Sequence, residues 1–168
     1  MEKYIVFVSG LSGTGKSTIK EYFDQNPITE YRVYDFDKGK NKCPEDEKYH
    51  LKWRSDQTEH WLKIGTENLK KNLGTIIFGL SLYPQNIIKM AERHGIKESQ
   101  LKFGYLITED EERKKRLFDR GTPRHWQGEK PWYKIFYQEL KDVNAKEFNT
   151  SGKKIEVLVG EIIKWMAE

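Results

Sequence analysis

The stretch Gly10-Leu-Ser-Gly-Thr-Gly-Lys-Ser17 decides the fold of this 168-residue chain. It has the G-x-x-x-x-G-K-S spacing of a Walker A phosphate loop, and it stands between an apolar run at 4–8 and a helical pattern at 19–24. Glycines let such a loop curl until backbone N–H groups point inward, and the following helix adds the positive end of its dipole. The stretch therefore predicts a site for the phosphates of a nucleoside triphosphate. A glycine-rich turn with a solvated lysine is the weaker alternative.

Two side chains of this loop have expected roles beyond the backbone cradle. Lys16 is expected to reach the β and γ phosphates and to act in catalysis. Ser17 offers a hydroxyl to Mg²⁺, a hard cation that prefers oxygen ligands. ATP and Mg²⁺ are therefore the expected cofactors. The expected nucleotide contacts in the loop are Gly10, Leu11, Ser12, Gly13, Thr14, Gly15, Lys16, Ser17 and Thr18.

Apolar runs and helical patterns alternate along the rest of the chain. Strands are expected at 4–8, 31–34, 74–79 and 101–107, and residues 154–157 form either a short strand or the start of the last helix. The other expected helices are 19–24, 45–73, 87–94, 109–120 and 133–143. Such alternation predicts a parallel sheet with helices on both faces. The expected fold class is α/β, a three-layer α/β/α P-loop NTPase fold with a mainly parallel sheet of about five strands, in one domain spanning 1–168.

The composition excludes several classes of protein. No apolar run approaches the roughly 20 residues of a membrane-spanning helix, and Met1, Glu2 and Lys3 lead into an apolar strand without a secretory cleavage pattern. Cys43 is the only cysteine, so neither an intrachain disulfide nor a cysteine-based metal site can form. The net charge of +4, from 30 basic and 26 acidic residues, gives no argument for a nucleic-acid partner. We expect a cytoplasmic monomer or homodimer without a membrane partner.

Carboxylates that could serve the phosphate site stand after the second expected strand. The third strand ends in Phe78-Gly-Leu-Ser81 and offers no acid, whereas Asp35 and Asp37 close the second strand. Ligands of parallel α/β sheets bind beyond the carboxyl ends of the strands. A spacing of two puts both acids on one side of an extended backbone, so that one could orient metal waters and the other meet an acceptor hydroxyl. The alternative is an Asp-rich turn that caps the next element.

With these residues the chain resembles the small P-loop kinases that include the nucleoside monophosphate, shikimate and gluconate kinases. The resemblance rests on the phosphate loop, Asp35-Phe-Asp37, Trp53-Arg54 with Glu59, and Arg116-Leu-Phe-Asp-Arg120. It implies that Asp35 assists Mg²⁺ and that Asp37 is the base at the acceptor hydroxyl. It also implies that Arg54, in an acceptor-binding segment at 38–73, and Gly79 contact the acceptor. The chain lacks the glycine triplet of shikimate kinases and the Asp-Gly-Phe-Pro turn of monophosphate kinases.

Arginines spaced by three or four residues indicate a lid at about 113–132. They are Arg113, Arg116, Arg120 and Arg124. The resemblance puts Arg116 near the adenine and Arg120 at the transferring phosphoryl group, where an arginine stabilises developing charge. Arg124 is a candidate acceptor contact, and Thr150 lies where the family wraps backbone around the adenine. The alternative for these arginines is a solvated helix face neutralised by the acids at 109–112.

Three functions fit these patterns. The leading one is an ATP-dependent kinase that moves the γ-phosphoryl group to a small-molecule acceptor, such as a nucleoside, a nucleotide or a small hydroxy metabolite. The guanidinium of Arg54 suits an acceptor carboxylate or phosphate, although a solvated Arg54 packed on Trp53 is equally compatible. A nucleic-acid end kinase is possible but not favoured, and an acceptor-free ATPase or switch would not need a second carboxylate. The end kinase would use Lys38, Lys40, Lys42 and the tryptophans of the 121–132 loop.

Overall fold

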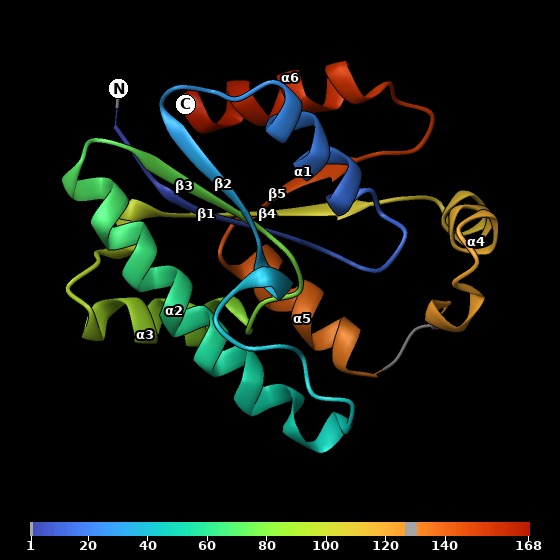
Figure 1. The fold of residues 1–168 in the computed structure, drawn as a ribbon, viewed down its shortest axis with the longest axis horizontal. Coiled ribbons are helices and arrows are strands. Elements are labelled where there is room, and N and C mark those ends of the chain that lie inside the picture. Colours follow the sequence, from blue (N-terminus) through green and yellow to red (C-terminus); the bar gives the residue numbers. More distant parts are fainter. Residues whose placement is uncertain (1, 127–130) are drawn as a thin grey trace.

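A parallel five-stranded sheet organises the chain (Figure 1). The computed structural model describes residues 2–126 and 131–168, apart from the side chains of Arg124 and Pro131. Within these residues the sheet has the order β2-β3-β1-β4-β5, and every neighbouring pair is parallel. The strands are β1 (Ile5–Gly10), β2 (Tyr31–Asp35), β3 (Gly74–Phe78), β4 (Leu101–Ile107) and β5 (Lys146–Asn149).

Helices cover both faces of the sheet because successive side chains of each strand enter two different cores. In β1, Ile5 and Phe7 belong to one core and Val6 and Val8 to the other. The first core is completed by α2 (His50–Lys70), α3 (Pro84–Arg93) and α5 (Pro131–Asp142), and the second by α1 (Lys16–Gln25) and α6 (Ile155–Ala167). Helix α4 (Asp110–Asp119) follows the carboxyl end of β4, at the right of Figure 1. The predicted three-layer α/β/α fold is confirmed.

The fifth strand lies elsewhere than the sequence patterns indicate. Strand β5 (Lys146–Asn149) pairs with β4, whereas residues 154–157 hold no strand and α6 begins at Ile155. The strand alternative for 154–157 is therefore wrong, and the alternative that they begin the last helix is confirmed. Strand β5 escaped prediction because it is an edge strand of four residues in which Phe148 alone is buried.

Short 3₁₀ helices interrupt the connections. The helix predicted over 45–73 consists of a 3₁₀ turn, η2 (Glu47–Tyr49), followed by α2. The others are η1 (Phe36–Lys38), η3 (Glu98–Gln100) and η4 (Pro123–His125). None of the helices in the described residues is long and apolar enough to cross a membrane.

Strand ends determine where a site can form. Strands β1, β2 and β3 are parallel neighbours, so their carboxyl ends lie at one edge of the sheet. The segments that leave these ends are the phosphate loop, η1 with the loop after it, and residues 79–83. In a parallel α/β sheet this edge is where ligands bind.

Candidate active site

The phosphate loop has the backbone that its glycines allow. Gly13 and Gly15 have φ angles of 87° and 98°, in the left-handed region that favours glycine. Helix α1 begins directly at Lys16, so its amino-terminal N–H groups face the loop. Thr14 is buried, and its hydroxyl donates to the carbonyl of Leu11 at 2.8 Å. The loop is thus a preformed anion cradle.

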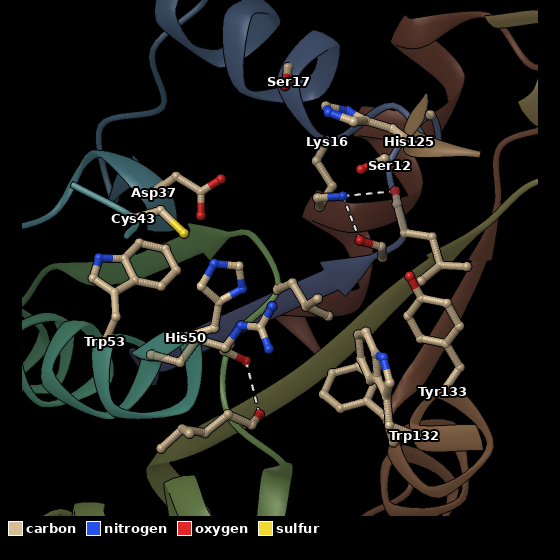
Figure 2. A pocket seen from close by; sticks show the side chains of 18 of the residues that line it. Ser12, Lys16, Ser17, Asp37, Cys43, His50, Trp53, His125, Trp132 and Tyr133 are labelled. Carbon is tan, nitrogen blue, oxygen red and sulfur yellow. Dashed lines mark hydrogen bonds between the residues drawn. The ribbon is translucent and has the colours of Figure 1, made fainter. Parts of the chain in front are cut away.

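Lys16 folds over the loop that carries it. Its ammonium donates to the carbonyls of Gly10 and Leu11, the latter at 2.8 Å (Figure 2). Burial lowers the pKa of Lys16 to about 8, while the charge of Asp37 opposes the shift and that of Arg120 adds to it. The carboxylates at the end of β2 and the arginines on and just after α4 are therefore close enough to act on the same lysine.

Arg113 is a buried side chain that contacts the phosphate loop. This residue of α4 is 5% exposed, and its guanidinium donates to the carbonyl of Ser12 at 3.2 Å. Its Cγ is so close to Gly13 that a Cβ there would lie 3.0 Å away. The ring of Trp126 covers the guanidinium at 4.4 Å. Sequence reasoning grouped Arg113 with the lid arginines, whereas its contacts are those of a positioning residue.

Arg116 and Thr150, two predicted nucleotide contacts, are in contact with each other. The guanidinium of Arg116 donates to Oγ1 of Thr150 at 3.0 Å and to its carbonyl at 3.1 Å, and it also pairs with Glu112. The Thr150 hydroxyl is buried and lies 2.6 Å from that of Thr108. These bonds connect α4 to the segment after β5, beside the phosphate loop.

A cavity of about 710 Å³ opens beside the phosphate loop. Figure 2 shows Lys16 at one side of it, Asp37, Cys43, His50 and Trp53 at a second, and Trp132 and Tyr133 opposite them. Its lining comes from the loop, from the segment after β2 with α2, from residues 80–83, from the end of α4 and from α5. Both ends of a phosphoryl transfer could therefore be held in one space.

The two aspartates have different surroundings. Oδ1 of Asp35 accepts the backbone N–H of Asp37 at 3.0 Å and so caps η1. Asp37 lines the cavity. Desolvation raises the pKa of the Asp37 carboxyl, as does the charge of Asp35, while Lys16 and Arg54 oppose the shift. Asp35 thus forms the turn named as the alternative, whereas Asp37 lines the cavity.

Buried side chains of α2 hold the loop that carries Asp37. Gln57, which is 0% exposed, donates to the carbonyls of Phe36 at 3.3 Å and Asn41 at 3.0 Å. The indole N–H of Trp61 also donates to Phe36 at 3.1 Å, and that of Trp53 donates to Asn41 at 2.9 Å. No local pattern indicates these roles, because the bonds join α2 to the backbone of a different segment.

Arg54 lies in the cavity wall, but its aromatic neighbour is not the expected one. Its guanidinium carbon lies 5.8 Å from the centre of the Trp132 ring at the start of α5. Trp53 instead packs edge-on against Phe36, with ring centres 5.7 Å apart. Arg54 therefore connects the predicted acceptor segment with α5 across the cavity.

Some of the other residues predicted for the acceptor site and the lid line the cavity, and others do not. Gly79 is buried, and a Cβ there would lie 2.2 Å from Cβ of Phe36, so the glycine allows the strand to pass close to η1. The cavity wall is formed by the next four residues, 80–83. Arg120 lines the cavity and donates to Oγ1 of Thr122 at 3.2 Å, and His125 also lines it. The side chain of Arg124 and residues 127–130 of the predicted lid lie outside the described residues.

The oxygen donors near the loop suit magnesium. The hydroxyl of Ser17 is on the second residue of α1, where the side chain is exposed, and Asp35 ends β2. The described part of the chain contains no group of three or more His, Cys, Asp or Glu side chains that could hold a metal ion. Mg²⁺ commonly takes only one or two protein oxygens and completes its shell with water and substrate phosphates, so this small donor set fits it.

Comparison of the sequence with known proteins finds no match. No protein-family model matches the chain, and no curated protein matches it either.

Solved structures, in contrast, resemble it over nearly the whole chain. The tunicamycin resistance protein of Deinococcus radiodurans superimposes with a TM-score of 0.64 at 14% identity, over 98% of this chain and 95% of that one. Shikimate kinase from Acinetobacter baumannii, in complex with shikimate, gives 0.61 at 15% identity over 98% and 93%. A gluconokinase from Sinorhizobium meliloti gives 0.52 at 16% identity over 98% and 91%. At these identities the likeness concerns the fold, and the chain has the fold of the small P-loop kinases.

Proposed function

We propose that the protein is an ATP-dependent kinase that transfers the γ-phosphoryl group to a hydroxyl of a small molecule. One observation carries the proposal: Lys16 of the phosphate loop and the carboxylate of Asp37 line the same cavity. Among the described residues no cation lies within 4.0 Å of that carboxylate, so no ion pair occupies it. An acid in this position can accept a proton from an attacking hydroxyl. An acceptor-free ATPase would have no use for the rest of the cavity.

The phosphate loop binds and orients the nucleotide in this proposal. Its backbone N–H groups and Lys16 hold the β and γ phosphates, and Ser17 with Asp35 would hold Mg²⁺. The metal supplies charge neutralisation at the phosphates when bound. Arg116 and the backbone at Thr150 lie beside the loop, which supports their assignment to the adenine side.

Asp37 and Arg120 serve the transfer itself. As the acceptor oxygen bonds to the γ phosphorus and the bond to the β–γ bridging oxygen breaks, the hydroxyl proton passes to the Asp37 carboxylate. Arg120 lines the same cavity and its charge acts on Lys16, which supports a role in stabilising the transferred group. The segment 38–73, through Arg54, would bind the acceptor, and the proposed lid at 113–132 would close over the phosphates.

Transfer of radiolabel from γ-labelled MgATP to a panel of hydroxyl compounds tests the proposal. We expect labelled small-molecule products, their loss in Lys16→Ala, and a drop of about 10²- to 10⁴-fold in Asp37→Asn with MgATP binding retained. Circular dichroism and binding of a nonhydrolysable ATP analogue show whether each variant is folded. Phosphate release that no acceptor stimulates would identify an ATPase instead. Label that enters only oligonucleotide ends would identify a nucleic-acid kinase.

A further inference from the structure

The acceptor end of the cavity carries excess negative charge. Of the charged side chains that line the cavity in the described residues, Lys16 and Arg120 belong to the phosphate end. The remainder comprises two carboxylates, Asp37 and Glu47, and one guanidinium, that of Arg54. An acceptor with its own carboxylate or phosphate would face two like charges and one cation. Like charges placed together disfavour a ligand, and because Asp37 and Glu47 are both exposed, water screens part of this repulsion.

Arg54 is the only cation among the described residues that line this end of the cavity. Arg54 lies against the face of Trp132, and its Nε is buried without a hydrogen-bond partner among the described residues. Strong recognition of carboxylate or phosphate uses two parallel N–H donors, and dianions commonly need more than one cation. The unpartnered Nε–H of Arg54 can donate to one neutral oxygen of an acceptor, such as a carbonyl or hydroxyl.

Flat aromatic surfaces form much of the remaining wall. Trp53 contributes a small area to the wall, because the residue is only 6% exposed, and its ring is held by a hydrogen bond to the Asn41 carbonyl. On the opposite side, in Figure 2, Trp132 packs on Tyr133 with ring centres 3.9 Å apart. Rigid aromatic walls offer a large apolar contact area to a flat aromatic body. Leu51, Leu80, Leu82, Tyr83 and Phe136 extend this surface.

We propose, on the basis of the kinase function above, that the acceptor is an uncharged alcohol with a flat aromatic body. Its ring lies against the tryptophan walls, a neutral oxygen accepts from Arg54, and its hydroxyl meets Asp37. This class excludes sugar acids and nucleoside monophosphates as preferred acceptors. It also separates the chain from the shikimate and gluconate kinases that share its fold, whose named acceptors are acids.

Cys43 gives a binding assay that does not depend on transfer. It is the only cysteine in the chain, it is exposed, and it lines the acceptor end of the cavity. A bound acceptor should slow its alkylation by iodoacetamide. The assay is run with a nonhydrolysable ATP analogue and Mg²⁺, so that compounds with a base do not occupy the nucleotide site. Analogue binding is first verified by thermal shift, since a bound ligand raises stability by mass action.

Two matched pairs of probes separate charge from shape. Thymidine and its 5′-monophosphate differ by the phosphate, and 4-nitrophenyl glucoside and glucose differ by the aromatic ring. We expect thymidine to protect Cys43 at a concentration about tenfold or more below that of its monophosphate, and the glucoside to protect where glucose does not. Glu47→Gln should reduce the difference in protection between thymidine and its monophosphate. Trp132→Ala should reduce the difference between the glucoside and glucose. Phe118→Ala, a ring outside the cavity that is 55% exposed, should change neither.

Each result decides the proposal. Equal or better protection by the monophosphate or by glucose overturns it, and so does an absence of protection by both uncharged aromatic compounds. In those cases analogue binding that is lost in Lys16→Ala would leave the kinase function standing. Failure of the analogue to stabilise the wild-type protein would instead remove the kinase function and the acceptor class together.

Discussion

Replacement of Gln57 by alanine should separate catalysis from nucleotide binding. The side chain is fully buried, and its amide makes three hydrogen bonds to the loop after β2: to the carbonyls of Phe36 and Asn41, and from the N–H of Asn41 at 3.4 Å. Both carbonyls keep a second donor, the indoles of Trp61 and Trp53. The variant therefore loses weak hydrogen bonds and gains a small cavity, but it leaves neither carbonyl without a donor. We expect the free energy of unfolding to fall by about 2 kcal/mol.

The effect on rate should exceed what this loss of stability explains. Gln57 also fills the space beside Gly39, where a Cβ would lie 2.6 Å from Oε1, so without it the backbone next to Asp37 can shift. A displacement of about 1 Å at a reacting group can cost about 10²-fold in rate. We expect kcat to fall about 10- to 100-fold while affinity for the ATP analogue stays within about twofold, because the phosphate loop receives no bond from Gln57.

Thr58→Ala is the matched control. Thr58 is the next residue of α2 and is equally buried, but its hydroxyl donates within the helix, to the carbonyl of Arg54 at 2.7 Å. Urea unfolding and steady-state transfer should show lower stability with near-normal kcat. If Gln57→Ala keeps wild-type kcat at temperatures where it is folded, or if Thr58→Ala loses as much, the reasoning about the Asp37 loop is refuted.

Three further outcomes follow from the phosphate site. Gly13→Ala should weaken ATP-analogue binding about tenfold or more, since φ is positive and space is lacking, whereas Gly95→Ala, with φ of 73° and nothing within 4 Å, should lower stability alone. The kcat/KM for ATP should decline as pH rises through about 8, where free Lys16 loses its proton. On the acid side kcat/KM should increase with pH through a pKa above the usual aspartate value, because Asp37 must lose its proton, and the Asp37→Asn variant should not show this increase. Asp35→Asn should raise the magnesium concentration needed for half-maximal rate, and added metal should restore part of the lost rate. An unchanged metal dependence would mean that Asp35 serves only to cap the turn.

Local constraints explain which parts of the fold could be predicted from the sequence. The phosphate loop follows from glycine spacing, because a left-handed backbone at two nearby positions restricts both residue type and conformation. Strand β4 has the predicted bounds because it has an almost continuous apolar run. Strand β5 has one buried residue, Phe148, and its strand conformation depends on pairing with β4. No local pattern can report such a dependence.

The proposed acceptor end of the cavity could be predicted only in part, for a different reason. Its wall is assembled from segments far apart in the sequence, so that Arg54 meets Trp132 rather than its neighbour Trp53. The position of Asp37 in the cavity wall could be predicted because the ends of parallel strands lie at one edge of the sheet. Gln57 could not, since its role depends on where the backbone of another segment passes.

The two alternatives that the sequence offers for the Asp35–Asp37 pair do not exclude each other. A carboxylate has about four acceptor sites on its two oxygens, and the turn uses one of them, Oδ1 of Asp35. The other oxygen can still orient metal-bound water. The same hydrogen bond fixes the backbone at Asp37, whose carboxylate lines the cavity. The capping turn would therefore give the two acids different tasks. In the proposed function it would hold Asp35 at the strand end on the metal side and direct Asp37 toward the acceptor.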